Sequence, residues 1–192
     1  MQAIYPCSMS ARALPAPLAA IPNALTLLRL LLIPLFIAIL WPADDGHSVA
    51  AAVVFGVAGV SDYLDGWLAR RWGVQSDFGR IADPLADRLM IDAAVVLLVV
   101  VHDRLPWVAL AIVIARDALL IGGYKLLMPR GYELNVNFLG KAATWVLYFA
   151  LFFVLVTESG ADWPLWTFWF GVALAIAAAL QYVVTALRGR ST

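Results

Sequence analysis

The sequence has little of what a soluble enzyme or a disulfide-stabilised domain needs. Only 14% of its 192 residues are charged, whereas a soluble domain has about 25%. One cysteine, Cys7, excludes an internal disulfide, and two histidines are too few for a histidine-rich metal site. The 13 basic residues only balance the 13 acidic ones, so the chain lacks the basic excess of a nucleic-acid-binding surface. No nucleic-acid partner is therefore expected, and any metal ion must be bound by carboxylates.

Long apolar runs are what the sequence does have. Hydrophobic residues make up 64% of the chain, against about 45–50% in a soluble domain. A membrane-spanning helix needs about 20 mostly apolar residues, and six runs meet this requirement. They cover residues 21–41, 48–72, 79–101, 106–128, 138–157 and 163–187. The predicted fold is an all-α, polytopic membrane protein with six transmembrane helices within residues 21–188. Residues 1–20 are expected to form a loose tail or surface helix, and residues 189–192 a short tail.

The basic residues predict how this protein is oriented. Loops rich in lysine and arginine stay on the cytoplasmic side of a membrane. One side of the predicted bundle has only Arg104, and its turns also hold His47 and His102, which we expect to be solvated. The other side has Arg70, Arg71, Arg80, Lys125, Arg130, Lys141, Arg188 and Arg190. Both termini are therefore predicted to be cytoplasmic, in the cell (inner) membrane.

Four aspartates interrupt the second and third apolar runs. Asp62 and Asp65 are three residues apart, and Asp83 and Asp87 are four apart, so each pair shares one face of its helix. A charged side chain inside a membrane costs about 2.5–3.5 kcal/mol on insertion scales. Two antiparallel helices can point these faces at each other, and four clustered carboxylates repel unless a cation compensates them. Mg²⁺ prefers to be shared between carboxylates and substrate phosphates, which predicts a metal site here.

Small and basic residues near the aspartates favour a phosphate-containing ligand. Gly66, Ala69 and Gly79 lack bulk, which lets helices or a ligand approach the backbone closely. Arg70 offers a planar guanidinium to a phosphate at the cytoplasmic end of the second run. A diphosphate over a di-metal carboxylate site is an arrangement suited to phosphoryl transfer.

These residues form a motif that resembles a known family. The pattern is Asp62-x2-Asp65-Gly66-x2-Ala69-Arg70-x8-Gly79-x3-Asp83-x3-Asp87. It is similar, without a departure, to the signature of the CDP-alcohol phosphatidyltransferases, integral membrane enzymes of phospholipid synthesis. The size of the chain and its six-helix layout are also similar to that family.

The resemblance implies a homodimer of six-helix subunits and a transfer reaction that uses CDP-diacylglycerol. By this likeness the four aspartates would hold two Mg²⁺ or Mn²⁺ ions, and Asp87 would also deprotonate the acceptor hydroxyl. The residues implied to contact the CDP moiety are Asp62, Gly66, Arg70 and Gly79. Attack at the β-phosphorus would then release CMP.

Further likeness concerns the acceptor alcohol. Residues 21–29, Ile-Pro-Asn-Ala-Leu-Thr-Leu-Leu-Arg, and residues 83–87, Asp-Pro-Leu-Ala-Asp, resemble phosphatidylglycerophosphate synthases and the related cardiolipin synthases. The synthase pattern Gly-Lys-x-Lys-Thr is only partly kept, because Lys141 is present but Ala143 replaces the second lysine. Arg116 is followed by Asp117, which resembles the cardiolipin synthases. Arg116 and Lys141 could bind the acceptor's phosphate, and glycerol 3-phosphate is the first expectation, with phosphatidylglycerol as the alternative. If glycerol 3-phosphate is the acceptor, we expect a lysine at position 143 to be tolerated or even to lower its KM.

Plainer interpretations exist for most of these residues. The aspartates could form a structural ion-pair network with Arg70, Arg80 and Arg88, or line the pathway of an ion- or proton-coupled transporter. No self-similar halves, which are common in transporters, are present. Asn23, Thr26 and Arg29 are equally compatible with a helix cap and interfacial anchor or with function. Long cations such as Arg116 and Lys141 also reach the membrane surface without a ligand. Asp92 is expected to pair with a neighbouring arginine.

Overall fold

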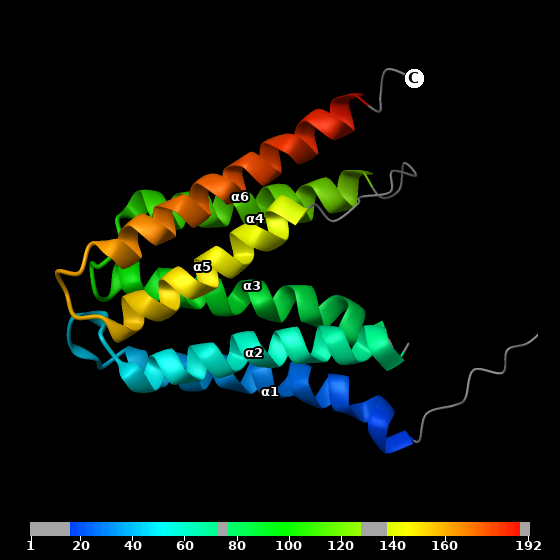
Figure 1. The fold of residues 1–192 in the computed structure, drawn as a ribbon, viewed down its shortest axis with the longest axis horizontal. Coiled ribbons are helices and arrows are strands. Elements are labelled where there is room, and N and C mark those ends of the chain that lie inside the picture. Colours follow the sequence, from blue (N-terminus) through cyan, green and yellow to red (C-terminus); the bar gives the residue numbers. More distant parts are fainter. Residues whose placement is uncertain (1–15, 73–76, 128–137, 189–192) are drawn as a thin grey trace, which may run out of the picture.

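The computed structural model describes residues 16–72, 77–127 and 138–188, with side chains at residues 24–64, 67, 88–119 and 138–181. Its described residues form helices and no strand (Figure 1). The elements are α1 (Ala16–Leu40), the short 3₁₀ turn η1 (Asp44–Gly46), α2 (Val49–Trp72), α3 (Asp77–Val100), α4 (Trp107–Leu127), α5 (Phe138–Val156) and α6 (Trp163–Arg188). The predicted all-α fold is thus confirmed.

The six α-helices coincide closely with the six apolar runs, except at the start of α1. That helix begins at Ala16 instead of Ile21, so residues 16–20 continue it and do not belong to a separate tail. Pro17 lies in the first turn, where a missing N–H costs no hydrogen bond. The residues that follow it, Leu18, Ala19 and Ala20, are strong helix formers.

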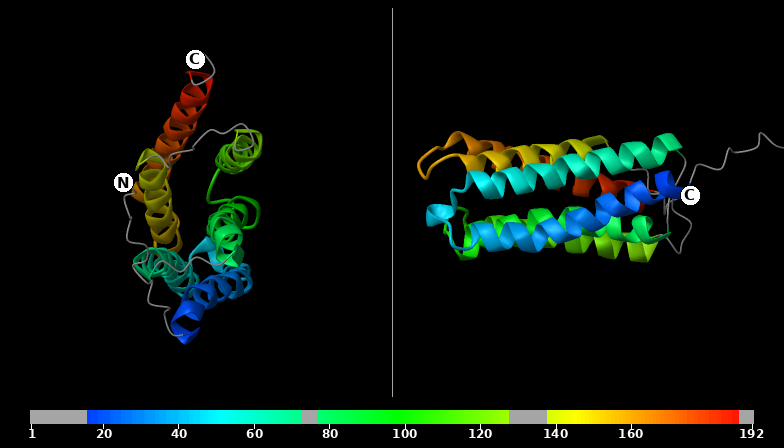
Figure 2. Two further views of the ribbon diagram at one scale, coloured as in Figure 1. Left: turned by 90° about the vertical axis from the view of Figure 1, so that its right-hand side faces the viewer. Right: turned by 90° about the horizontal axis from the view of Figure 1, so that it is seen from below.

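The three short connections gather at one end of the molecule, on the left in Figure 1. We call this the turn end; it holds residues 41–48, 101–106 and 157–162. The start of α1 and the end of α6 lie at the opposite end, which we call the motif end. Along the bundle, α1 packs on α2 and α3, α5 packs on α2 and α6, and α4 packs on α3 and α6 (Figure 2).

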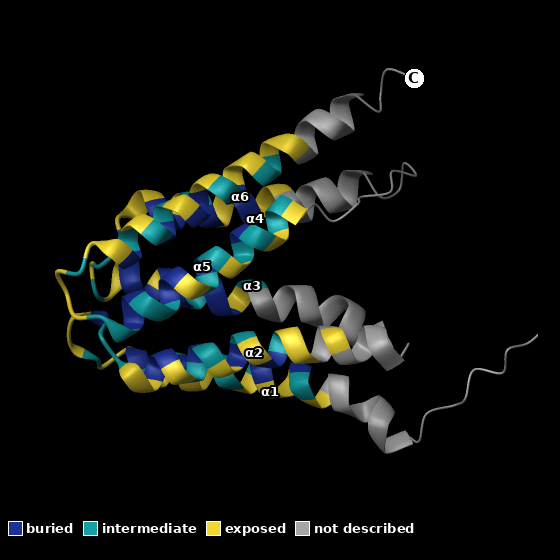
Figure 3. Ribbon diagram, viewed as in Figure 1, coloured by how far each residue is buried: buried dark blue, intermediate teal, exposed yellow. Residues whose placement is uncertain are grey.

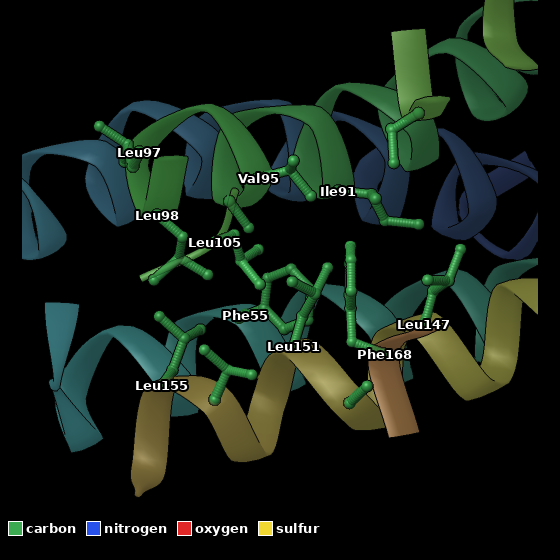
Figure 4. Packing of buried hydrophobic residues seen from close by; sticks show 14 of the residues in the cluster. Phe55, Ile91, Val95, Leu97, Leu98, Leu105, Leu147, Leu151, Leu155 and Phe168 are labelled. Carbon is green, nitrogen blue, oxygen red and sulfur yellow. The ribbon is translucent and has the colours of Figure 1, made fainter. Parts of the chain in front are cut away.

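Buried apolar side chains fill the bundle between the helices (Figures 3 and 4). Phe55 of α2 packs in this cluster beside Leu151 of α5 and Phe168 of α6. Gly59 lets α2 approach α5 closely, since a Cβ atom there would lie 3.1 Å from the ring of Tyr148. The half of α2 that precedes the aspartates is therefore held firmly against α5.

Side-chain hydrogen bonds to backbone carbonyls tie the turn end together. Nη1 of Arg104 donates to the carbonyl oxygens of Val154 and Thr157 at 2.8 and 2.9 Å, and Nη2 donates to that of Glu158 at 3.2 Å. Burial lowers the pKa of the Arg104 guanidinium, and the Asp45 carboxylate opposes this shift. Because the last carbonyls of a helix lack partners within it, Arg104 acts as a cap for α5.

The two histidines act in the same way, so the expectation that they are solvated is wrong. Nε2 of His47 donates to the carbonyl oxygen of Val156 at 2.8 Å, and Nε2 of His102 donates to that of Leu40 at 3.0 Å. Both side chains are half-buried. Each turn is thereby joined to the end of a helix from another part of the chain.

The outward faces of the helices are apolar. Exposed tryptophans stand where helices meet the turn end, at Trp41, Trp107, Trp163 and Trp166, as expected for side chains at a membrane surface. Among the described residues, Phe138–Val156 and Trp163–Gln181 are long and apolar enough to cross a membrane, while Ala24–Leu40 and Val49–Leu64 are shorter apolar stretches.

Candidate active site

The aspartate motif lies on two consecutive helices near the motif end. Asp62 and Asp65 are on the second half of α2, and Asp83 and Asp87 are on the first half of α3. These helices pack against each other, as the sequence predicts. The side chains of Asp65, Gly66, Arg70, Gly79, Asp83 and Asp87 lie outside the described residues, so the convergence of four carboxylates stays a prediction.

Asp62, whose side chain is described, is held by an arginine from α1. Nη2 of Arg29 lies 3.2 Å from Oδ1 of Asp62, and the two side chains are 0% and 33% exposed. A guanidinium buried this completely needs a compensating charge, which Asp62 supplies. The other oxygen, Oδ2, has no hydrogen bond or ion pair within the described part of the chain.

The structure excludes the interpretation of Asn23, Thr26 and Arg29 as a helix cap and membrane-surface anchor. Asn23 lies inside α1 and is not its N-cap, because the helix starts at Ala16. Thr26 and Arg29, one turn apart, are both buried in the protein, which excludes an anchor at the membrane surface. The sequence feature that could have indicated this pairing is an arginine within an apolar run, because such a charge is costly without a partner.

A second group of charges lies between α3 and α4. Oδ1 of Asp117 accepts a hydrogen bond from Nη1 of Arg88 at 2.6 Å and another from Nε of Arg116 at 2.9 Å. Asp117 and Arg116 are buried, with side chains each 9% exposed, and Arg88 is 29% exposed. Arg116 lies in the middle of α4 and is not placed to reach the membrane surface. The sequence did not indicate this pairing.

Asp92 belongs to the same group but does not pair as expected. Its carboxyl group interacts with that of Asp117 and, electrostatically, with the guanidinium groups of Arg116 and Arg88. It nevertheless forms no ion pair with an arginine in the described residues. Its Oδ1 is buried without a hydrogen-bond partner there. Since Arg88 binds Asp117, its described contacts also give no support to a structural network between Arg88 and the four aspartates.

Lys141 and Ala143 differ sharply in their surroundings. Lys141, in the first turn of α5, is exposed, and the structure does not bring it into contact with Arg116. Ala143 is 1% exposed and belongs to the core. A lysine there would place a charged group among apolar side chains, which costs several kcal/mol per ion as an order of magnitude. This burial argues against the expectation that the substitution is tolerated, which stays a prediction.

Comparison with known proteins agrees with the motif. Residues 19–180 match the CDP-alcohol phosphatidyltransferase family. A cardiolipin synthase (CMP-forming) of Streptomyces coelicolor is 42% identical over 151 residues, which cover 74% of this chain and 67% of that protein. The CDP-diacylglycerol–glycerol-3-phosphate 3-phosphatidyltransferase of Escherichia coli is 35% identical over 164 residues, or 83% of this chain and 87% of that one. Its Bacillus subtilis counterpart is 34% identical over 166 residues, with 76% and 86% coverage.

The all-helical fold, the apolar surface and these matches define a class, that of membrane transferases of phospholipid synthesis. Within it, the chain belongs to the CDP-alcohol phosphatidyltransferase family.

Proposed function

We propose that this protein transfers the phosphatidyl group of CDP-diacylglycerol to a glycerol-based acceptor and releases CMP. The observation that carries the proposal is the unbroken motif on α2 and α3, whose first aspartate is held by Arg29 through one oxygen, Oδ1. The names of the relatives support the same donor substrate. In the reaction, the acceptor oxygen bonds to the β-phosphorus, the bond from that phosphorus to CMP breaks, and the hydroxyl proton passes to Asp87.

The four aspartates suit hard divalent cations. Carboxylate oxygens are ligands that Mg²⁺ and Mn²⁺ accept, and Oδ2 of Asp62 offers such an oxygen. We propose that Asp62, Asp65, Asp83 and Asp87 hold two of these ions. Bound there, they would neutralise charge on the diphosphate and the departing CMP. The residues proposed to contact the CDP moiety itself are Asp62, Gly66, Arg70 and Gly79.

Glycerol 3-phosphate is the first candidate acceptor. The Escherichia coli and Bacillus subtilis relatives carry this substrate in their names. Arg116 and Lys141 are the cations proposed for its phosphate. Charge-assisted hydrogen bonds to phosphate are stronger than neutral ones, and arginine can make two at once.

Phosphatidylglycerol is a second candidate, favoured by two observations. The cardiolipin synthase relative has the higher identity, 42% against 35%. In addition, Asp117 lies 2.9 Å from Arg116 and offsets part of its charge, which suits a monoanionic phosphodiester better than a dianionic phosphate. Such an acceptor would arrive through the lipid and not from water.

One assay separates these candidates. The purified protein with CDP-diacylglycerol and Mg²⁺ or Mn²⁺ is given either glycerol 3-phosphate or phosphatidylglycerol, and CMP and the lipid product are identified. Phosphatidylglycerophosphate supports the first candidate, and cardiolipin made without phosphatidylglycerophosphate supports the second. Absence of CMP release with both acceptors would contradict the proposed function.

We further propose that the protein works as a homodimer with six membrane spans and with both termini in the cytoplasm. The helix lengths, 19 to 26 residues, are compatible with a hydrocarbon core of about 30 Å. The motif end would then face the cytoplasm, where water-soluble CMP leaves.

A further inference from the structure

The shared carboxylate between α3 and α4 carries an inference that rests on the proposed function. We propose that Asp117 is a positioning residue. It orients Arg116 toward the phosphate of the acceptor alcohol and, through Arg88, couples Arg116 to the helix that carries Asp87.

The contact to Arg116 leaves the outer part of its guanidinium available. Asp117 binds the Nε atom, which is the donor nearest the chain. Among the described residues the two terminal nitrogens have no hydrogen-bond partner, and neither is among the fully buried unpaired atoms. A guanidinium has five N–H donors in a fixed plane. Holding Nε therefore fixes the direction in which the other four point without using them.

The environment of Asp117 fits positioning better than stabilisation. Its Oδ1 serves both arginines, while its Oδ2 has no donor among the described residues and its carboxyl group interacts directly with that of Asp92. Buried ion pairs of this kind are often no more stable than apolar side chains of similar size. Two carboxyl groups buried against each other repel, which is a poor choice for stability alone. What Asp117 does provide is a fixed geometry for two cations on two helices.

Arg88 connects this geometry to the aspartate motif. It directly follows Asp87 on α3, and its 2.6 Å hydrogen bond to Asp117 joins α3 to α4. A helix moves its side chains as a rigid unit, so a tether at position 88 limits rotation and sliding of α3. The position of Asp87 relative to Arg116 is limited by the same contact.

A transfer reaction needs such a fixed relation. The attacking hydroxyl must lie about 3–3.5 Å from the phosphorus, and a displacement of about 1 Å can cost about 100-fold in rate. Arg116 would hold the phosphate of the acceptor while Asp87 receives the proton from its hydroxyl. The distance between the two groups sets how well the hydroxyl is aligned.

The test compares variants of the full-length protein with the acceptor that the wild type uses. Asp117→Asn keeps the size of the side chain and removes its charge. We expect it to raise the KM for the acceptor about tenfold, which equals about 1.4 kcal/mol of lost binding. The KM for CDP-diacylglycerol should stay within about twofold, and Asp117→Glu should recover part of the loss because a carboxylate is again present.

Asp92→Asn is the matched control. It removes a carboxylate that interacts with Asp117 but forms no ion pair with either arginine in the described residues, and an asparagine there can still donate a hydrogen bond to Asp117. We expect both KM values to stay near those of the wild type. An increase in acceptor KM as large as that of Asp117→Asn would overturn the proposal, because total charge and not the contact to Arg116 would then be responsible.

A double variant shows whether Asp117 acts through Arg116. If it does, Asp117→Asn combined with Arg116→Lys should raise the acceptor KM no further than Arg116→Lys alone. Independent, multiplicative effects would overturn the inference. So would a parallel change in both KM values with a lowered melting midpoint, since that pattern indicates a merely structural role.

The proposal can also be tested if a variant does not fold or if the wild-type protein is inactive. If Asp117→Asn does not fold, Asp117→Glu and Arg116→Lys take its place, and unchanged acceptor KM values in both would overturn the inference. A wild-type protein that releases CMP while Asp117→Asn and Asp117→Glu keep its acceptor KM contradicts the positioning role and leaves the proposed function standing. A wild type that releases no CMP with glycerol 3-phosphate or phosphatidylglycerol overturns the proposed function, and this inference with it.

Discussion

Arg29 of α1 and Asp62 of α2 form an ion pair, with Nη2 and Oδ1 3.2 Å apart. The arginine is completely buried, whereas the aspartate is one-third exposed, so the pair has a protein-facing and a ligand-facing side. Removing one partner of such a pair leaves an uncompensated charge. Arg29 therefore fixes the first carboxylate of the motif from a helix that contributes none of the four aspartates.

Replacing Arg29 tests this relationship. We expect Arg29→Met to lower CMP release about tenfold or more, as is typical when the partner of a metal ligand is lost. Arg29→Lys should retain more activity because it keeps the charge, although not the planar geometry. Excess Mn²⁺ should not restore Arg29→Met, since Asp62 would lack the buried guanidinium that orients it. Near-native activity of Arg29→Met in a correctly folded protein would contradict the role assigned to Arg29.

Metal removal tests the interpretation of the four aspartates. With only oxygen ligands proposed, activity should disappear in excess EDTA and return with Mg²⁺ or Mn²⁺. CMP release from CDP-diacylglycerol is the measurement. Full activity in the chelator would show that the carboxylates serve another purpose.

The proposed base has a more specific test. Asp87→Asn keeps the size of the side chain but cannot accept the proton, so turnover should fall by about 100-fold or more. Binding of CDP-diacylglycerol should be partly kept. Asp62→Asn should weaken nucleotide and metal binding as well as turnover. Titration of the labelled nucleotide separates the two effects, and near-native turnover of Asp87→Asn would refute its role as a base.

The helices could be predicted because each apolar run has the length of one helix and is bounded by residues that favour turns. Position along a helix follows from residue spacing, so the placement of the motif on two consecutive helices was also predictable. The start of α1 was not, because Pro17 is compatible both with a first turn and with a tail. The burial of Ala143 was not predictable either, because it depends on how α5 is rotated about its axis.

The partners of the buried charges could not be predicted for a related reason. Whether Arg88 meets an aspartate of the motif or Asp117 depends on how α3 is turned against α4. His47 and His102 bind backbone carbonyls, which every residue has, so no residue type in the sequence indicates them. Arg29 and Arg116 stand within apolar segments, where a charge is costly, but the sequence left open whether each finds a partner or reaches the membrane surface.

Arg104 gives a prediction about stability. Arg104→Met removes three hydrogen bonds to carbonyl oxygens at the end of α5. The melting midpoint should fall by several degrees, at about 2–4 °C for each kcal/mol in a chain of this size. The melting midpoint of Arg104→Lys should lie between those of the wild type and Arg104→Met, because lysine keeps the charge but not the planar group. The acceptor KM should not change, since Arg104 is at the turn end, and an unchanged melting midpoint would argue against the capping role.

The orientation in the membrane can be measured with single cysteines after Cys7 is replaced. Asp162→Cys suits the turn end, because Asp162 is exposed and no side-chain hydrogen bond of it is found in the described residues. Asp103 is less suitable because its φ of 53° strains most side chains. Gln75→Cys reports on the connection between α2 and α3. A membrane-impermeant thiol reagent added to intact cells should label position 162 but not position 75, because the basic residues cluster at the motif end. Labelling of position 75 alone would reverse the orientation and place the proposed site on the outer side of the membrane.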